Sequence, residues 1–166
     1  MFESKVYVNR RRALAEKMAA MTAEGSRGVA VFLGNVDAPT NYRGNDYKFR
    51  QDSSFLYFWG VDEPWFAALI DLDSADECLY GNDVDIDDII WMGPQPSVAS
   101  KGEAIGCAKT LPLAEFDKAV AAAVAAGRPV HFLPPARYYN QMKLAELTGI
   151  PSAQVRKVTP VAAGGA

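Results

Sequence analysis

The side chains whose spacing best suits chemistry lie in an acidic run, DLDSADECLYGNDVDIDD, which contains no lysine or arginine. Within it, Asp83, Asp85 and Asp87 match the first three ligand positions of an EF-hand calcium loop. The glycine that such a loop requires is replaced by Asp88, however, and its closing glutamate by Pro94. The run is therefore interpreted as a solvated turn, with aspartates at the start of a short helix where the helix dipole favours them.

Nucleophiles and bases are scarce in this chain. His131 is the only histidine, so a two-histidine metal site is excluded, and its apolar neighbours indicate a packed or edge position in a strand rather than a catalytic base. Cys78 and Cys107 are interpreted as small core residues rather than nucleophiles. No glycine-rich motif for binding nucleotide phosphates occurs. The sequence therefore predicts no catalytic residue and no metal ligand.

A stretch of aromatic and charged residues, FRQDSSFLYFWGVDEPWF, is the most unusual feature. Residues 54–60 are predicted to form a strand with rings on both faces, which favours a sheet core over a binding cleft. Arg50 and Asp52 precede this strand, and we expect a charge-assisted hydrogen bond between them to fix the incoming loop. Glu63 and Pro64 are expected to turn the chain into the next strand. All four polar or turn residues are thus assigned architectural roles.

The remaining elements follow from apolar periodicity and from glycine and proline stops. Residues 65–72 are almost wholly apolar and are predicted to form a central strand, the second of three consecutive antiparallel strands. The element order predicts an α/β fold, a mixed β-sheet flanked by α-helices. The predicted strands cover residues 28–34, 54–60, 65–72, 76–82 and 128–135, and the predicted helices cover residues 7–21, 113–126 and 137–147.

The composition is that of one globular domain, with 166 residues of which 49% are apolar and 22% are charged. A net charge of -3 and a pI near 5.2 provide no basic surface, so nucleic acid is excluded as the main partner. No run of about 20 apolar residues and no apolar leader occurs, so neither a membrane span nor export is predicted. Two cysteines without paired spacing favour a cytoplasmic location.

Several segments together resemble the N-terminal domain of aminopeptidase P, prolidase and related creatinase-like metallopeptidases. The longest is FRQDSSFLYFWGVDEPWFAALI. VNRRRALAEKM is similar to the first helix of that domain, FLGN to its first strand, IIWMGPQPS to its tryptophan-glycine segment, and VHFLPPARYYNQMKLAELTGI to its closing strand and helix. The resemblance covers nearly the whole chain.

The resemblance implies a parent that cleaves peptides with proline after the N-terminal residue. Residues 1–154 would form its N-terminal domain, and residues 155–166 would be a linker towards a C-terminal pita-bread domain that holds two divalent metal ions, commonly manganese. No cofactor is implied in this chain itself. The implied partners are the chain's own catalytic domain, a second subunit and a proline-containing peptide. Trp91 matches a tryptophan that reaches the partner's substrate site in some members, although it could equally cap an apolar edge.

The sequence leaves two classes of function open. The first is a non-catalytic N-terminal domain that supports subunit association and shapes the substrate entrance of a proline-specific metallopeptidase. The alternative is a free-standing module that binds a protein or a small molecule with the same fold. An intrinsic hydrolase ranks last, because the residues that hydrolysis would need are missing from the chain.

Overall fold

The computed structural model describes residues 2–21, 26–42, 44–84, 90 and 93–155. Its centre is a five-stranded sheet with the order β4-β3-β2-β1-β5. The strands are β1 (Val29–Leu33), β2 (Ala67–Asp71), β3 (Glu77–Tyr80), β4 (Thr110–Leu111) and β5 (Val130–His131). The prediction of a mixed sheet flanked by helices is confirmed.

Strand pairing gives the sheet both directions. β2 pairs antiparallel with β1 on one side and with β3 on the other, while β5 runs parallel to β1 and β4 runs parallel to β3. The central position predicted for the apolar segment at residues 65–72 is therefore correct, since β2 occupies the middle of the sheet. Such a strand must be covered on both faces, which explains its continuous apolar sequence.

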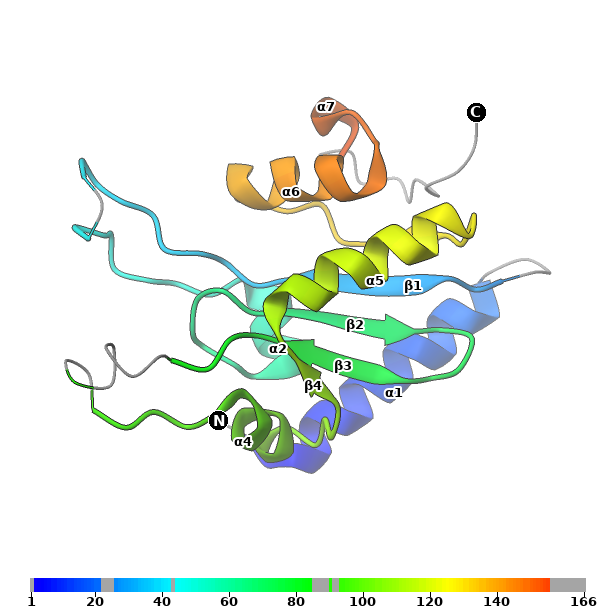
Figure 1. The fold of residues 1–166 in the computed structure, drawn as a ribbon. Coiled ribbons are helices and arrows are strands. Elements are labelled where there is room, and N and C mark those ends of the chain that lie inside the picture. Colours follow the sequence, from blue (N-terminus) through cyan, green and yellow to red (C-terminus); the bar gives the residue numbers. More distant parts are fainter. Residues whose placement is uncertain (1, 22–25, 43, 85–89, 91–92, 156–166) are drawn as a thin grey trace.

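Successive side chains of β1 and β2 pack alternately into two separate hydrophobic cores, one on each face of the sheet. Ala30 and Ile70 belong to the core on one face, while Val31 and Leu69 belong to the core on the other. The first core is closed by α1 (Ser4–Met21), α2 (Ser53–Trp59) and α4 (Val98–Ala104). The second is closed by α5 (Leu113–Ala125), α6 (Tyr138–Thr148) and α7 (Ser152–Val155). Figure 1 shows α1 and α5 on opposite faces of the sheet.

Residues 53–59 form the helix α2, so the prediction of a strand there is wrong. The Asp52 carboxylate accepts hydrogen bonds from the backbone N–H groups of Ser54 and Phe55, at 2.9 and 3.0 Å, and so caps the helix N-terminus. Gly60 ends the helix in the left-handed conformation, with φ at 69°. A Cβ atom at Gly60 would lie 2.3 Å from the Tyr7 ring, so this close approach requires glycine.

The predicted order of three consecutive strands is corrected accordingly to one helix followed by β2 and β3. The helices predicted at residues 7–21, 113–126 and 137–147 are confirmed as α1, α5 and α6, and α6 ends at Gly149 as expected. The sequence did not predict α4, β4 or α7. Each helix in the described part of the chain is too short or too polar to cross a lipid bilayer.

Candidate functional site

The residues assigned architectural roles lie around the start of α2 and the turn before β2. Asp52 caps α2, as described above, and the Arg50 side chain makes neither a hydrogen bond nor an ion pair with it in the described structure. Instead, the Arg50 carbonyl accepts a hydrogen bond of 2.8 Å from Asn35 Nδ2. The Asp52 carboxylate is directed to backbone N–H groups because a helix begins directly after it.

Gln51, between these two residues, organises the loop from a buried position and was missed by the sequence analysis. Its Oε1 accepts hydrogen bonds from the N–H groups of Asn35, at 2.6 Å, and Asp52, at 2.9 Å. Its Nε2 donates to the carbonyls of Val61, at 3.3 Å, and Glu63, at 2.7 Å. One buried amide therefore joins the end of β1, the start of α2 and the turn before β2. The only sequence signal for this role was the presence of a neutral polar residue within the stretch of aromatic and charged residues.

The turn before β2 contains Glu63 and Pro64. The Glu63 carboxylate forms an ion pair of 2.6 Å with Lys101 of α4. Pro64 is half-buried and is followed by Trp65, which adopts a φ of 65°. A non-glycine residue in this region costs on the order of 1–3 kcal/mol and often marks a functional position.

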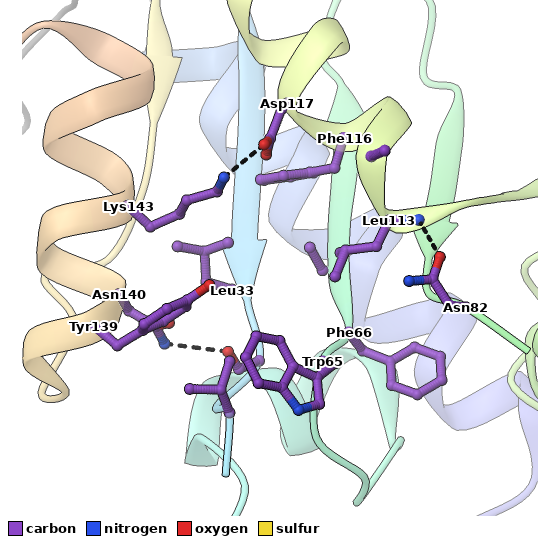
Figure 2. Close-up of a pocket in the computed structure, with 14 residues that line it drawn as sticks. Leu33, Trp65, Phe66, Asn82, Leu113, Phe116, Asp117, Tyr139, Asn140 and Lys143 are labelled. Atoms are coloured by element: carbon purple, nitrogen blue, oxygen red, sulfur yellow. Dashed lines mark hydrogen bonds and ion pairs between the residues drawn. The ribbon is translucent and has the colours of Figure 1, made fainter. Parts of the chain in front are cut away.

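A pocket of about 220 Å³ opens beside Trp65. We call it the Trp65 pocket; Figure 2 shows the residues that line it. Its apolar surface comes from the end of β1, the start of β2 and the first turns of α5, through Leu33, Ala67, Leu113 and Phe116. These side chains converge because β1 ends where the antiparallel strand β2 begins. This end of the two strands lies under the N-terminus of α5.

Two aromatic side chains form one wall of the Trp65 pocket. The Trp65 ring lies edge to face against Tyr139 of α6, with 5.8 Å between the ring centroids. Its Nε1–H donates a hydrogen bond of 3.0 Å to the Asp37 carboxylate. Trp65 is 44% exposed and Tyr139 is 47% exposed, so both rings present open surface. The indole is therefore held in place at its polar edge while part of its surface stays available.

Polar groups surround the rest of the pocket, and Lys143 and Asp117 lie across it from Trp65 (Figure 2). Lys143 Nζ of α6 forms an ion pair of 2.5 Å with Asp117 of α5. Asn82 Oδ1 accepts a hydrogen bond of 3.0 Å from the Leu113 N–H. Asn140 is buried, and its Nδ2 donates to the Gly34 carbonyl at 3.2 Å. An apolar pocket with a few convergent polar groups is the usual form of a small-molecule binding site.

The sequence model "Aminopeptidase P, N-terminal domain" matches residues 7–131 of the 166-residue chain. The chain belongs to this family. The comparison with curated proteins finds no match. The N-terminal domain expected from the resemblance is thereby confirmed.

Solved structures of aminopeptidase P share the fold of this N-terminal domain. A variant of Escherichia coli aminopeptidase P has a TM-score of 0.70 and 21% identity, covering 89% of this chain and 33% of that chain. Pseudomonas aeruginosa aminopeptidase PepP has a TM-score of 0.69 and 20% identity, covering 96% and 35%. The chain thus spans about a third of the length of these relatives. Another similar structure is a zinc-substituted E. coli aminopeptidase P in complex with product.

Members of the aminopeptidase P family are metal-dependent, but the described residues of this domain do not fit a metal centre. Nowhere in the described ranges do three or more His, Cys, Asp or Glu side chains lie together as a metal site requires. Asp83, the first of the three aspartates that match EF-hand ligand positions, accepts a hydrogen bond of 2.6 Å from the Val98 N–H. Asp85, Asp87 and Asp88 lie outside the described residues, as does Trp91.

The potential nucleophiles and the lone histidine of this domain lie away from the Trp65 pocket, whose lining contains no histidine, cysteine or serine. His131 is in the edge strand β5, where Nε2 lies 2.9 Å from the Arg27 carbonyl. Cys78 and Cys107 are both buried, and burial raises the pKa of the Cys107 thiol to about 11. The lining of the pocket therefore offers apolar, aromatic and charged contacts to a ligand.

Proposed function

We propose that this chain is the non-catalytic N-terminal domain of a proline-specific metallopeptidase, an Xaa-Pro aminopeptidase or dipeptidase. The observation that carries the proposal is the family match over residues 7–131, combined with a chain that spans about a third of the relatives' length. Residues 1–154 form the domain, and residues 155–166 lead towards a catalytic domain. That domain binds two divalent metal ions, which we propose to be manganese. The parent is cytoplasmic.

Within that parent, the domain supports subunit association and shapes the substrate entrance. Large apolar side chains are exposed on α6 and just before it, with Leu133 at 57%, Tyr138 at 71% and Met142 at 43% exposure. The loop that follows β1 extends away from the sheet and exposes Tyr42 and Tyr47 (Figure 1). Exposed apolar surface of this kind supports a role in contacts with other polypeptide.

Activity measurements test whether catalysis requires the peptidase domain. The 166-residue chain is incubated with Xaa-Pro peptides and Mn²⁺, beside a longer polypeptide that continues into the peptidase domain. We expect turnover only from the longer polypeptide. Metal-dependent cleavage by the 166-residue chain would overturn the proposal. If no peptidase sequence follows this domain in its gene, the free-standing binding module becomes the better account.

The role of Trp91 in the substrate entrance is tested in the longer polypeptide. Trp91→Ala is expected to lower kcat/KM for a proline-containing peptide by about tenfold, which corresponds to roughly 1.4 kcal/mol of lost binding. Tyr57→Ala serves as the matched control, since it removes another exposed aromatic ring, which does not line the Trp65 pocket, and should leave kcat/KM unchanged. Unchanged kcat/KM in Trp91→Ala would assign Trp91 to an apolar edge instead.

Light scattering tests subunit association. The longer polypeptide is expected to form a dimer or a larger oligomer, and the isolated chain is expected to give a mass of at least twice its 18.0 kDa. A monomer in both samples would remove association from the proposed function while leaving the family assignment intact.

A further inference from the structure

The Trp65 pocket has two features that core packing does not require. Trp65 keeps a left-handed backbone conformation, with φ at 65°, although it is a bulky residue at the surface. Across the pocket, Lys143 and Asp117 bring opposite charges from two different helices to the edge of an apolar surface (Figure 2). A strained aromatic residue and a reachable ion pair at one pocket indicate a built binding site.

We propose that the Trp65 pocket binds a free α-amino acid with an apolar side chain. The carboxylate of the ligand binds Lys143, and its ammonium group binds Asp117. Its side chain lies on the apolar surface formed by Leu33 and Leu113, beside the Trp65 ring. This inference goes beyond the proposed function, because it concerns a ligand of the N-terminal domain itself.

The charges of the pocket favour a zwitterion. Lys143 and Asp117 neutralise each other, so a ligand with only one charge would compensate one of them and leave the other without its partner. A zwitterion can insert its ammonium and carboxylate groups so that every charge keeps an opposite neighbour. The two side chains are 23% and 43% exposed, so the pair is accessible to such a ligand.

The size and lining of the pocket limit the ligand to one amino acid. Its volume of about 220 Å³ lies below the roughly 300–1,000 Å³ typical of pockets for larger ligands. Leu33, Ala67, Leu113 and Phe116 offer no charge to a polar side chain, so an apolar one is selected. A phosphate ligand is disfavoured, because the single lysine of the lining is already paired with a carboxylate.

Titration of the ¹⁵N-labelled chain with L-leucine and with L-phenylalanine tests the proposal. The side-chain N–H signals of Trp65, Asn82 and Asn140 report on the pocket directly. We expect saturable shifts at these signals with a Kd of about 1 mM, as is usual for a ligand of this size. Absence of a saturable shift with either amino acid up to about 10 mM would overturn the proposal.

A series of blocked ligands then separates the three contacts without altering the protein. N-acetyl-leucine lacks the ammonium group, leucinamide lacks the carboxylate, and glycine lacks the side chain. Each is expected to bind at least about tenfold more weakly than leucine, since each loses one charged or apolar contact. Equal binding of N-acetyl-leucine and leucine would refute recognition of a zwitterion.

Variants with a matched control locate the binding. Lys143→Met and Asp117→Asn are each expected to weaken leucine binding by about tenfold or more. Lys118→Met is the control, since Lys118 also forms an ion pair from α5, with Glu115 at 2.6 Å, but does not line the pocket. Dispersed ¹⁵N spectra confirm folding. If Lys118→Met weakened binding as much as Lys143→Met, the pocket would not be the site.

Discussion

At the residue scale, Asp52 stabilises the start of α2 with two charge-assisted hydrogen bonds to backbone N–H groups. We predict that Asp52→Ala lowers the free energy of unfolding by about 1–2 kcal/mol, the usual cost of removing a helix N-cap. Urea denaturation followed by circular dichroism measures the loss. Asp52→Asn should retain most of the stability, because the amide oxygen can still accept from Ser54 and Phe55.

Asp62→Ala is the matched control for this prediction. Asp62 lies just after α2, is exposed, and makes no hydrogen bond or ion pair with a described residue. Its removal should change stability by less than about 0.5 kcal/mol. A loss in Asp62→Ala equal to that in Asp52→Ala would mean that general charge, rather than capping, is responsible.

Gln51 contributes more than Asp52 to the stability of the same loop. We predict that Gln51→Ala lowers the free energy of unfolding by roughly 2–4 kcal/mol, since it leaves the buried backbone groups of Asn35 and Val61, and the Glu63 carbonyl, without their partners. Thermal unfolding provides the measurement. Gln154→Ala, an exposed position in α7, should be nearly neutral. A Gln51→Ala variant as stable as the parent chain would show that water replaces these bonds at no cost.

Asp52 and Gln51 also show what sequence can and cannot predict at a single position. An aspartate before two serines is a local signal for a helix start, since the cap acts within three residues. The partners of Gln51 lie up to 16 residues away. Nothing in its local sequence distinguishes it from a solvent-exposed glutamine, so only the fold reveals its role.

At the element scale, residues 53–59 form a helix although aromatic residues favour strands. Phe55 and Trp59 are four positions apart and both face the core, while Tyr57 between them is 51% exposed. The buried residues thus have helical spacing, but the sequence does not reveal it because the residues between them are also apolar. Asp52 and Gly60 at the two ends were the local signals that could have identified it.

Other elements were predictable because their local patterns agree with their place in the fold. The strands β1 and β2 are short apolar runs buried on both faces, and α5 repeats apolar residues with helical spacing. The helix α4, VASKGEA, was missed because only Val98 and Gly102 of its seven residues are buried. The two-residue strand β4 was missed because it depends on pairing with β3, whereas β5 lies within the strand predicted at residues 128–135.

The turn that joins β2 and β3 gives the sheet a pH-dependent stability. Burial would raise the pKa of Asp71, but hydrogen bonds from Arg128 and from the N–H groups of Asp73 and Ser74 outweigh it and hold that pKa below 3.8. Hydrogen bonds from the Ser26 hydroxyl and the Arg27 N–H likewise hold the pKa of Asp73 well below 3.8. Both carboxylates therefore prefer to stay ionised in the folded state.

Because both folded-state pKa values are depressed, the stabilisation is complete above the unfolded value of 3.8 and is lost as the pH falls through the folded values. We predict that the urea midpoint falls between about pH 5 and pH 2, and that Arg128→Met lowers stability at neutral pH while making this fall shallower. Urea titrations across that range provide the measurement. Lys118→Met, at a surface ion pair, should leave the slope unchanged. An unaltered slope in Arg128→Met would contradict this account.

At the scale of the whole molecule, the fold brings together residues that no local pattern connects. Val36, Trp65, Asn82, Asp117 and Lys143 line one pocket although they span more than a hundred positions of the chain. A sequence pattern cannot indicate such a site, because its members lie on separate elements whose packing decides whether they meet. The element order predicted the layers, and the packing of α5 and α6 on β1 and β2 then placed the pocket at one end of these strands.

On the face of the sheet that α1 covers, Arg11 connects several elements at once. Although it lies in α1, its side chain is fully buried and forms a 2.7 Å ion pair with Glu77 of β3. It also donates to the Phe58 carbonyl at 3.1 Å and to the Ile105 carbonyl at 3.1 Å, near the ends of α2 and α4. A guanidinium can serve three elements at once because its donors point in fixed, different directions.

We therefore predict that Arg11→Met lowers the free energy of unfolding by about 3–5 kcal/mol, since it leaves Glu77 without its buried partner and two helix ends without a donor. Chemical denaturation gives the magnitude, and hydrogen exchange shows whether α1, α2 and α4 lose protection together, as a shared anchor requires. Arg12→Met removes the same charge from the exposed side of α1 and should cost less than about 0.5 kcal/mol. If Arg11→Met destabilised α1 alone, the helices on this face would be held by apolar packing and not by the buried cation.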